Sequence, residues 1–270
     1  MRVIKIGLSS FALRWAFHAG MSLEAFLARA ADLGAEVVQL CENSGVDRLD
    51  DQALEDLAAG ARRLDLALEC GGTGGDIAGM ERGIRRTARL GGAVYRCVVD
   101  SDGLAPEAVL DHLRQLVPLL HECGVTLCLE NHFLFSPQTL GGMVRCLDDP
   151  AVRICLDPLN SIALWTGPRE TIRELAPWAH TAHVKDARIK RSGGGWLISG
   201  APLGEGDIDL PGYLAAIAPR VKSVLLESWM DPIDGEGGAR TLEQESIWAR
   251  NGLAVIRGIY SQTKSLLEEA

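Results

Sequence analysis

The chain has 270 residues, of which 47% are hydrophobic and 23% charged, which is enough apolar sequence to bury a sizeable core. Its formal net charge of −9 provides no global positive field, so nucleic acid and anionic membrane surfaces are excluded as expected partners. No run of 18 apolar residues occurs and the first residues lack a cleavage pattern, so we expect a cytoplasmic protein.

Short apolar runs rich in β-branched residues alternate along the chain with stretches of helical periodicity. This alternation is typical of a parallel sheet built from βα units. The eight predicted strands cover residues 3–9, 36–41, 67–71, 94–99, 126–131, 152–157, 181–185 and 224–227.

The helices between these strands have recognisable ends. Ser22 is the expected N-cap of the first helix and Gly34 ends it. The second helix runs through residues 54–64, the third covers 78–90, and the fourth has Pro106 in its first turn and ends at Gly124. Further helices are predicted over 139–147, 169–178, 210–217 and 242–267.

Eight consecutive strand–helix units in a chain of this length favour a closed (β/α)8 TIM barrel over an open doubly wound sheet. We expect one domain over residues 1–270, because no stretch resembles a linker. The Gly-rich run 71–76 follows a strand but has neither the dinucleotide-binding spacing nor the Lys of a P-loop. We interpret it as a tight βα loop, with a phosphate or hydroxyl cradle as the alternative.

Ionisable residues lie at the ends of four consecutive predicted strands: Glu130, Asp157, His183 and Glu227. The carboxyl ends of barrel strands converge on one face, so these side chains should meet there. Three crowded carboxylates would repel one another by several kcal/mol at an effective dielectric constant of about 20, whereas a divalent cation would be coordinated by them. Carboxylates with one imidazole suit Mn²⁺ first, while Mg²⁺, Co²⁺ and Zn²⁺ are also possible.

Several motifs at these positions resemble a known family. The sequences L-E-N-H at 129–132, L-D-P-L-N at 156–160, H-V-K-D at 183–186 and L-E-S at 226–228 resemble the xylose isomerase-like TIM barrel superfamily, and within it the sugar phosphate isomerase/epimerase group. The segment P-L-G-E-G-D-I-D-L-P-G-Y-L at 202–214 and the opening I-G-L-S-S-F-A-L-R-W at 6–15 are similar to the same group.

The resemblance implies that Glu130, Asp157, His183 and Glu227 hold one metal ion, and that the two glutamates also act as an acid/base pair on opposite faces of the substrate. A metal ion that stabilises an enediolate would make the removal of a neighbouring proton easier. Two positions depart from the family's ketohexose 3-epimerases, which have a His and a Glu where this chain has Asn160 and Ser136. The resemblance therefore does not extend to ketohexose specificity.

Other residues near the predicted barrel mouth are candidates for contact with the substrate. Lys185 lies two residues after His183 on the same strand face, so it is predicted to bind a substrate oxygen and to take part in catalysis, or else to form a structural ion pair. His132 stands in the same relation to Glu130; its alternative is a hydrogen-bonded loop histidine.

The remaining predicted substrate contacts are one amide and three aromatic side chains on βα loops: Asn160, Trp15, Trp196 and Trp229. The tryptophans would enclose a small pocket and exclude water, or they would pack against the barrel top or a neighbouring subunit. A homo-oligomer is compatible with both interpretations.

Three functions remain open from the sequence. The first is a metal-dependent isomerase or epimerase acting on a small ketose, inosose or other carbohydrate-like molecule through an enediolate. The second is a lyase that uses the same site to remove CO₂ from a 3-keto sugar acid or water from a keto-polyol. The third is a sugar-binding barrel in which the metal ion has a structural role.

Overall fold

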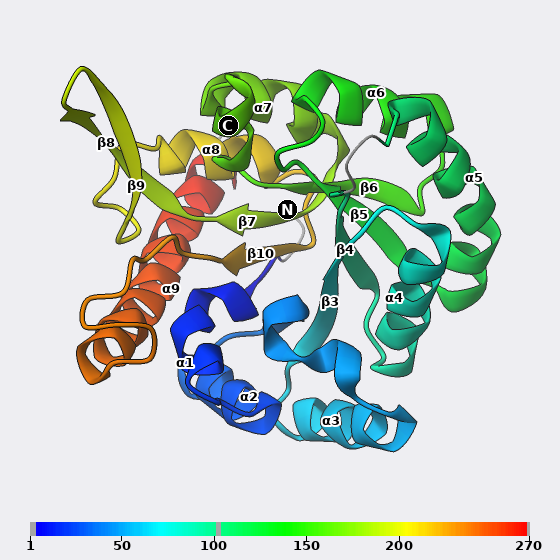
Figure 1. Cartoon of the computed structure of the whole chain (residues 1–270), viewed down its shortest axis with the longest axis horizontal. Helices are drawn as coiled ribbons and strands as arrows, with labels where there is room; N and C mark the ends of the chain where they lie inside the picture. Colours follow the sequence, from blue (N-terminus) through cyan, green and yellow to red (C-terminus); the bar gives the residue numbers. More distant parts are fainter. Residues whose placement is uncertain (1–3, 101–103, 269–270) are drawn as a thin grey trace.

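The computed structural model describes residues 4–100 and 104–268. Eight parallel strands close into a barrel in the order β1-β10-β7-β6-β5-β4-β3-β2, and helices surround it (Figure 1). The predicted (β/α)8 TIM barrel is confirmed. The barrel strands are β1 (Lys5–Ser9), β2 (Val37–Leu40), β3 (Ala67–Thr73), β4 (Val94–Val98), β5 (Thr126–Glu130), β6 (Val152–Leu156), β7 (Ala179–Val184) and β10 (Ser223–Leu226).

Every predicted strand coincides with one of these to within two residues at either end, apart from the start of the first, where Val3 lies outside the described residues. The α-helices are α1 (Arg14–His18), α2 (Leu23–Asp32), α3 (Asp51–Arg63), α4 (Ile77–Arg89), α5 (Pro106–Cys123), α6 (Pro137–Leu147), α7 (Pro168–Leu175), α8 (Leu210–Ile217) and α9 (Ala239–Glu268). Short 3₁₀ helices occupy Ser10–Leu13, Glu42–Ser44, Val46–Arg48, Asn160–Leu164 and Ala176–Trp178. In the part of the chain that is described, no helix is long and apolar enough to cross a membrane.

Local chemistry accounts for where the helices begin and end. The Ser22 hydroxyl accepts a hydrogen bond from the Ala25 N–H and caps α2, as predicted. Gly124 ends α5 with a φ of +64°, a conformation that glycine adopts without steric cost. The Gly-rich run after β3 reaches Asp76, the N-cap of α4, within three residues, which makes it the tight βα loop that the sequence indicates.

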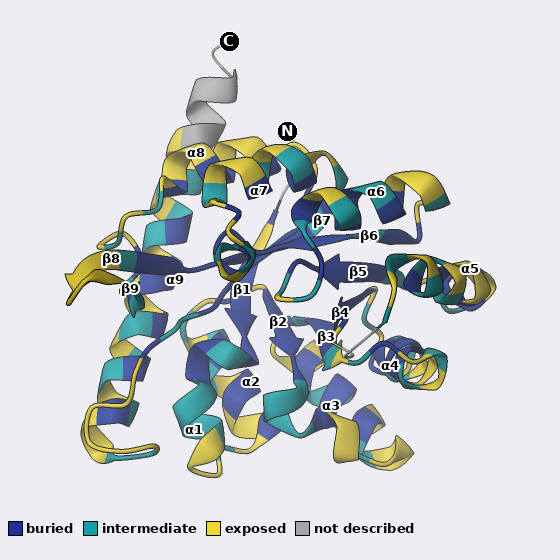
Figure 2. Ribbon diagram, turned by 45° about the horizontal axis from the view of Figure 1, so that its top comes forward, coloured by how far each residue is buried: buried dark blue, intermediate teal, exposed yellow. Residues whose placement is uncertain are grey.

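The hydrophobic core lies between the barrel and the inner faces of the helices, and the exposed residues lie on the outer faces (Figure 2). Tyr213 of α8 is fully buried and donates its hydroxyl to the backbone oxygens of His183, at 2.8 Å, and Leu156, at 2.9 Å. This helix therefore anchors the ends of β7 and β6, where two of the predicted metal ligands are located.

One element is not predicted from the sequence. Residues Asp186–Ser192 (β8) and Gly195–Ala201 (β9) form an antiparallel hairpin that projects from the barrel between β7 and α8 (Figure 1). The basic run 187–191, which has the composition of a solvated loop, is part of its first strand. Asp186 ties the base of the hairpin to the loop between β9 and α8, because its carboxylate accepts hydrogen bonds from the N–H groups of Gly204 and Gly206.

Two glycines in neighbouring helices provide a matched test of how closely the helices pack. A Cβ atom added at Gly83 of α4 would lie 2.1 Å from the buried Tyr95 ring of β4, whereas one added at Gly60 of α3 would have no neighbour closer than 3.7 Å. We expect Gly83→Ala to lower the free energy of unfolding by about 1–3 kcal/mol through overpacking. Gly60→Ala should raise it by about 0.5–1 kcal/mol. Denaturant titration measures both, and equal effects would contradict the predicted contact.

A buried carboxylate predicts a pH dependence of stability. Glu245 of α9 accepts hydrogen bonds from the backbone N–H groups of Trp15, at 2.7 Å, and Ala16, at 3.0 Å, at the start of α1. Burial raises the pKa of Glu245 to about 7, although these two hydrogen bonds oppose the shift. A folded-state pKa above the unfolded value means that the contribution to stability is complete below about pH 4.5 and is lost as pH rises through 7.

We therefore expect wild type to lose unfolding free energy relative to Glu245→Gln as the pH rises from 4.5 to 7. Above that range the difference between the two proteins should become constant. Denaturant titrations at a series of pH values measure this difference. A difference that is independent of pH would show that Glu245 does not titrate there.

Candidate metal centre

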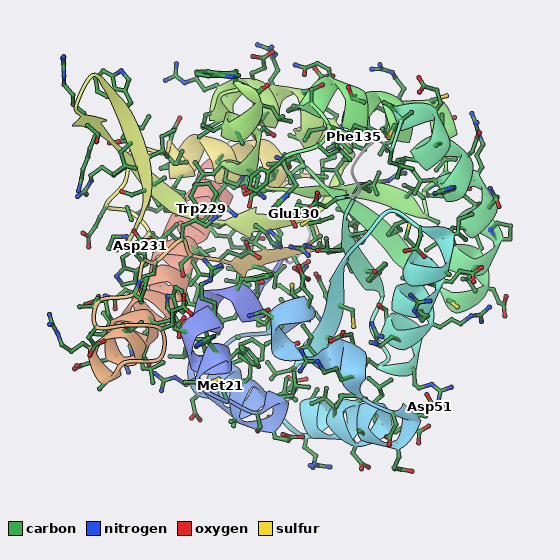
Figure 3. All side chains as sticks on the ribbon, in the orientation of Figure 1. Met21, Asp51, Glu130, Phe135, Trp229 and Asp231 are labelled. Carbon is green, nitrogen blue, oxygen red and sulfur yellow. The ribbon has the colours of Figure 1, made fainter. Side chains whose placement is uncertain are left out.

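The structure brings the four predicted metal ligands together. Glu130 ends β5, Asp157 follows β6, His183 lies near the end of β7 and Glu227 follows β10. These four strands are neighbours in the barrel, and Glu130 lies near the middle of the molecule (Figure 3). One donor atom from each residue lies within 4.8 Å of all the others, and all four residues are buried.

The donor atoms surround one ring nitrogen of His183. Its Nδ1 atom lies 3.3 Å from Glu130 Oε1, 3.5 Å from Glu227 Oε1 and 3.7 Å from Asp157 Oδ2. His183 Nδ1 is buried and, among the described residues, has no hydrogen-bond partner. Buried polar atoms without a partner are costly, and a cation at the common centre would satisfy all four groups at once. The residues present therefore fit a divalent metal ion.

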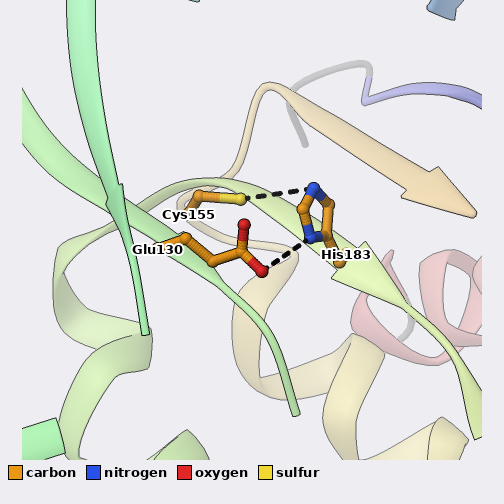
Figure 4. Close-up of side chains that lie close together, drawn as sticks. All are labelled: Glu130, Cys155 and His183. Atoms are coloured by element: carbon orange, nitrogen blue, oxygen red, sulfur yellow. Dashed lines mark hydrogen bonds and ion pairs between the residues drawn. The ribbon is translucent and has the colours of Figure 1, made fainter. Parts of the chain in front are cut away.

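Cys155 is a neighbour of the same imidazole (Figure 4). Its Sγ lies 3.6 Å from His183 Nε2, whereas Glu130 faces Nδ1 on the other side of the ring. Burial raises the pKa of Cys155 to about 11 in spite of the nearby His183, so the thiol is neutral. One ion cannot use both ring nitrogens of His183, and the set of three carboxylates is consequently the better metal site.

Both oxygens of Glu130 have partners besides the predicted metal position. Oε2 forms a buried ion pair with Arg96 Nε, and Oε1 accepts a 2.8 Å hydrogen bond from Asn160 Nδ2. Burial alone would raise the pKa of Glu130, but the Arg96 guanidinium and His183 hold it below its ordinary value. Arg96 also contacts Glu42 Oε2 at 3.2 Å. The sequence signal for this pair is a charged residue inside the apolar fourth strand, where an unpaired guanidinium would be costly.

Lys185 lies among the ligands as a buried ammonium group. Its Nζ is 2.6 Å from Asp157 Oδ2 and 3.3 Å from Glu227 Oε2. The first contact is a close ion pair with the same Asp157 oxygen that faces His183 Nδ1. Burial would lower the pKa of Lys185, but the Asp157 and Glu227 carboxylates outweigh that effect and raise it, so the side chain is charged.

A cavity of about 360 Å³ opens above these groups. It is lined by Phe11, Arg14, Glu42, Thr73, Arg96, Val98, Asp100, Glu130, His132, Phe133, Asn160, Lys185, Glu227, Ser228 and Trp229. A larger, mainly apolar groove lies between α7, the hairpin and α8, but none of the four predicted ligands lines it. The smaller cavity is the one that chemistry at the ligands would use.

The predicted substrate contacts fall into two groups. His132, Asn160, Lys185 and Trp229 line the cavity, and the Lys185 ammonium lies 4.8 Å from the centre of the Trp229 ring. Trp15 and Trp196 do not line it. The Trp15 indole N–H donates to the Met230 backbone oxygen at 2.8 Å, and Trp196 is 72% exposed on the projecting hairpin. Phe11 and Arg14, which follow the first strand, are not among the predicted contacts but do line the cavity.

Comparison with known proteins agrees with this architecture. Residues 27–251 match the family described as xylose isomerase-like TIM barrel. Over 258 residues the chain is 29% identical to the 3-oxo-isoapionate decarboxylase of Pectobacterium atrosepticum, with 92% of this chain and 93% of that protein covered.

Solved structures with the same fold include L-ribulose 3-epimerase, with a TM-score of 0.75, 16% identity, and coverage of 98% of this chain and 97% of that one. The IOLI protein with a bound zinc atom has a TM-score of 0.73 at 16% identity, with 96% and 99% covered. At such identities the two structures support the fold alone.

The ligand geometry predicts that stability depends on metal. Protein stripped with a chelator should gain about 2.7 kcal/mol in unfolding free energy when Mn²⁺ is present at 100 times its dissociation constant, because the ion binds only the folded chain. Asp157→Asn should abolish most of this gain, whereas Asp56→Asn, an exposed change on α3, should leave it intact. Thermal unfolding with and without Mn²⁺ measures the effect, and no stabilisation of wild type would exclude the site.

Proposed function

Because this chain belongs to the xylose isomerase-like TIM barrel family and is an enzyme of that superfamily, we propose that it is a divalent-metal-dependent decarboxylase of a small 3-oxo sugar acid. The relative that is 29% identical over 92% of the chain is a decarboxylase of a 3-oxo acid, which supports this choice. The geometric observation that supports the decarboxylase is that both carboxylate oxygens of Glu130 already have partners, Arg96 at Oε2 and Asn160 at Oε1.

Epimerisation needs a base on one face of the substrate and an acid on the other. Glu130 is poorly placed for either role, since Arg96 occupies Oε2 while Asn160 and the metal position share Oε1. Glu227 is similarly engaged. Its Oε1 accepts a 2.8 Å hydrogen bond from Ser9, and its Oε2 faces Lys185. We therefore assign both glutamates to holding the ion, in place of the acid/base pair that the family resemblance implies.

Decarboxylation of a 3-oxo acid needs no base. The electrons of the breaking C–C bond move toward the 3-oxo group, CO₂ leaves, and one proton is then delivered to the carbon. When bound by Glu130, Asp157, His183 and Glu227, a divalent ion would supply Lewis-acid polarisation of the oxo group. The chain itself must supply the proton and bind the acid.

Lys185 is the group placed to deliver that proton. Its charged Nζ lies at the cavity wall, held by Asp157 and Glu227, and it carries transferable protons. Phe11, Phe133 and Trp229 provide apolar surface in the cavity lining, and the Trp229 ring lies 4.8 Å from the Lys185 ammonium. An apolar surround favours the loss of a charged carboxylate as neutral CO₂ and keeps water from the carbanion.

Arg14 is suited to recognising an anionic substrate. It lines the cavity, and its guanidinium lies 5.9 Å from the centre of the Phe11 ring and 5.3 Å from that of Trp15. Within the described residues it has no ion pair of 4 Å or less, unlike Arg96 and Lys185. The substrate class that follows is a small acid with sugar-like hydroxyl groups.

We take Mn²⁺ as the native ion because three carboxylates and one imidazole are mainly hard donors, and Mg²⁺, Co²⁺ and Zn²⁺ are the alternatives. The net charge of −9 argues against nucleic acid as a partner. The cytoplasmic location and the homo-oligomer stay predictions.

The proposal is tested by following two products. Mn²⁺-loaded enzyme is incubated in D₂O with 3-oxo sugar acids labelled with ¹³C at the carboxyl group, and with the matching ketoses. We expect release of labelled CO₂ and one deuterium in the product, with no proton exchange in the ketoses. Lys185→Met should lower kcat by about 10²–10⁴-fold, as expected for loss of a general acid. Lys190→Met, an exposed change on β8, is the matched control.

Conversion or α-proton exchange of a ketose without release of CO₂ would contradict the decarboxylase activity and support an isomerase or epimerase. Undetectable turnover in both substrate sets by metal-loaded protein would favour the sugar-binding barrel. Full activity of Lys185→Met would remove the role given to Lys185.

A further inference from the structure

A line of buried polar side chains extends from His183 into the barrel interior, and the proposed reaction makes no use of it. His183 Nε2 lies 2.8 Å from Gln39 Oε1, and Gln39 Nε2 lies 3.0 Å from Glu69 Oε2. Gln39 belongs to β2 and Glu69 to β3, so the line crosses the barrel from β7. All three side chains are buried.

The far end of this line accepts hydrogen bonds. Ser223 donates to Glu69 Oε1, and Thr181 donates to Oε2 at 3.4 Å. Burial raises the pKa of Glu69, and the donors around it oppose that shift. Gln39 Nε2 and the Thr181 hydroxyl both donate to Oε2, so this oxygen must accept whether or not the other oxygen of the carboxyl group holds a proton. The group of Gln39 that faces Glu69 must therefore be the N–H₂ donor.

This requirement determines how the Gln39 amide is oriented. If the amide were turned over, its oxygen would lie against the Glu69 carboxylate, placing two acceptors about 3 Å apart. With the N–H₂ group directed at Glu69, the amide oxygen faces His183 and can only accept. The proton of a neutral His183 must then be on Nε2, and the lone pair of Nδ1 is directed at the three carboxylates.

We propose that Gln39, oriented by Glu69, is a positioning residue that keeps His183 in the tautomer needed for metal binding. The turned-over amide would favour a proton on Nδ1, where it would occupy the position of the ion. The inference rests on the metal site of the proposed function, but not on which reaction that site catalyses.

Two neighbouring thiols do not provide an equivalent constraint. Cys155 Sγ lies 3.6 Å from His183 Nε2, and Cys41 Sγ lies 3.4 Å from Gln39 Oε1. Burial raises the pKa of Cys41 to about 12 and that of Cys155 to about 11, so both are neutral thiols, which are weak hydrogen-bonding groups. Neither can select between the two orientations of the Gln39 amide as a carboxylate does.

The test uses three buried substitutions and two measurements that do not depend on turnover. Gln39→Met keeps the side-chain length but removes the acceptor, and Glu69→Gln keeps the shape but removes the charge. Thr181→Val is the matched control, because it removes the hydroxyl that contacts Glu69 at 3.4 Å and Ser223 at 2.8 Å and leaves the Gln39–Glu69 hydrogen bond in place. Mn²⁺ affinity is measured by calorimetry on chelator-stripped full-length protein. The His183 Nε2–H signal is followed by ¹⁵N NMR in Zn²⁺-loaded protein, which is diamagnetic.

We expect Gln39→Met to weaken Mn²⁺ binding by about 10–100-fold, the usual effect of removing the partner of a ligating histidine, and to shift the His183 Nε2–H signal. Glu69→Gln should shift the same signal and weaken binding by about 10-fold. Thr181→Val should bind Mn²⁺ within about twofold of wild type, because the Gln39–His183 contact is intact.

Wild-type Mn²⁺ affinity and an unshifted Nε2–H signal in either folded variant would overturn the positioning role. An equal loss of affinity in Thr181→Val would do the same, since it would indicate general damage to the barrel interior. If Gln39→Met does not fold, the Mn²⁺ affinity and the His183 Nε2–H signal of the near-isosteric Glu69→Gln variant test the positioning role. If the wild-type protein shows no decarboxylation but the variants lose Mn²⁺ affinity as expected, the proposed reaction is rejected and the positioning role of Gln39 is kept.

Discussion

Repulsion among three buried carboxylates at the barrel mouth is the constraint around which the site is built. Glu130, Asp157 and Glu227 converge because each ends or follows a neighbouring parallel strand, and the closed barrel brings those strand ends together. At such burial the arrangement is stable only with compensating positive charge. Arg96 and Lys185 provide two such charges, and Arg96 is shared with Glu42, so the three carboxylates keep net negative charge for a bound cation to meet.

The two protein cations do not act on the same carboxylates. Arg96 pairs with the outer oxygen of Glu130, while Lys185 contacts Asp157 and Glu227. One oxygen of each carboxylate is left facing His183 Nδ1. In the two glutamates these cations contact the oxygen that does not face the imidazole. In Asp157 that oxygen accepts hydrogen bonds from the backbone N–H groups of Leu159 and Asn160, and Lys185 contacts the oxygen that faces His183. The Gln39 amide determines which nitrogen of the imidazole faces the carboxylates with its lone pair. Metal binding in this protein consequently depends on residues from β2, β3 and β4 as well as on the four strands that carry the ligands.

How much of this is predictable from the sequence depends on the kind of signal each part carries. The barrel strands and the four ligands are predictable because an apolar run that ends in Glu, Asp or His is a strong signal for a strand that reaches the barrel mouth. The β8–β9 hairpin is missed because β8 has few apolar residues and its basic run 187–191 resembles a solvated loop. Gln39 and Glu69 are missed for a different reason. Single polar residues inside a strand reveal neither the face on which they lie nor their partner across the barrel, and only the closed geometry pairs them.

The same dependence on closed geometry bears on the choice of reaction. A 3-epimerase and a 3-oxo acid decarboxylase both need an electron sink at the oxo group, so the four ligands alone cannot distinguish the two chemistries. The difference lies in the proton carriers, because epimerisation requires two on opposite faces whereas decarboxylation requires one. In the proposed reaction Glu130, which is paired with Arg96, transfers no proton, and Lys185 is the single proton carrier at the cavity wall. The proposed loss of CO₂ therefore rests on the partners of one carboxylate, Glu130, and not on the four ligands themselves.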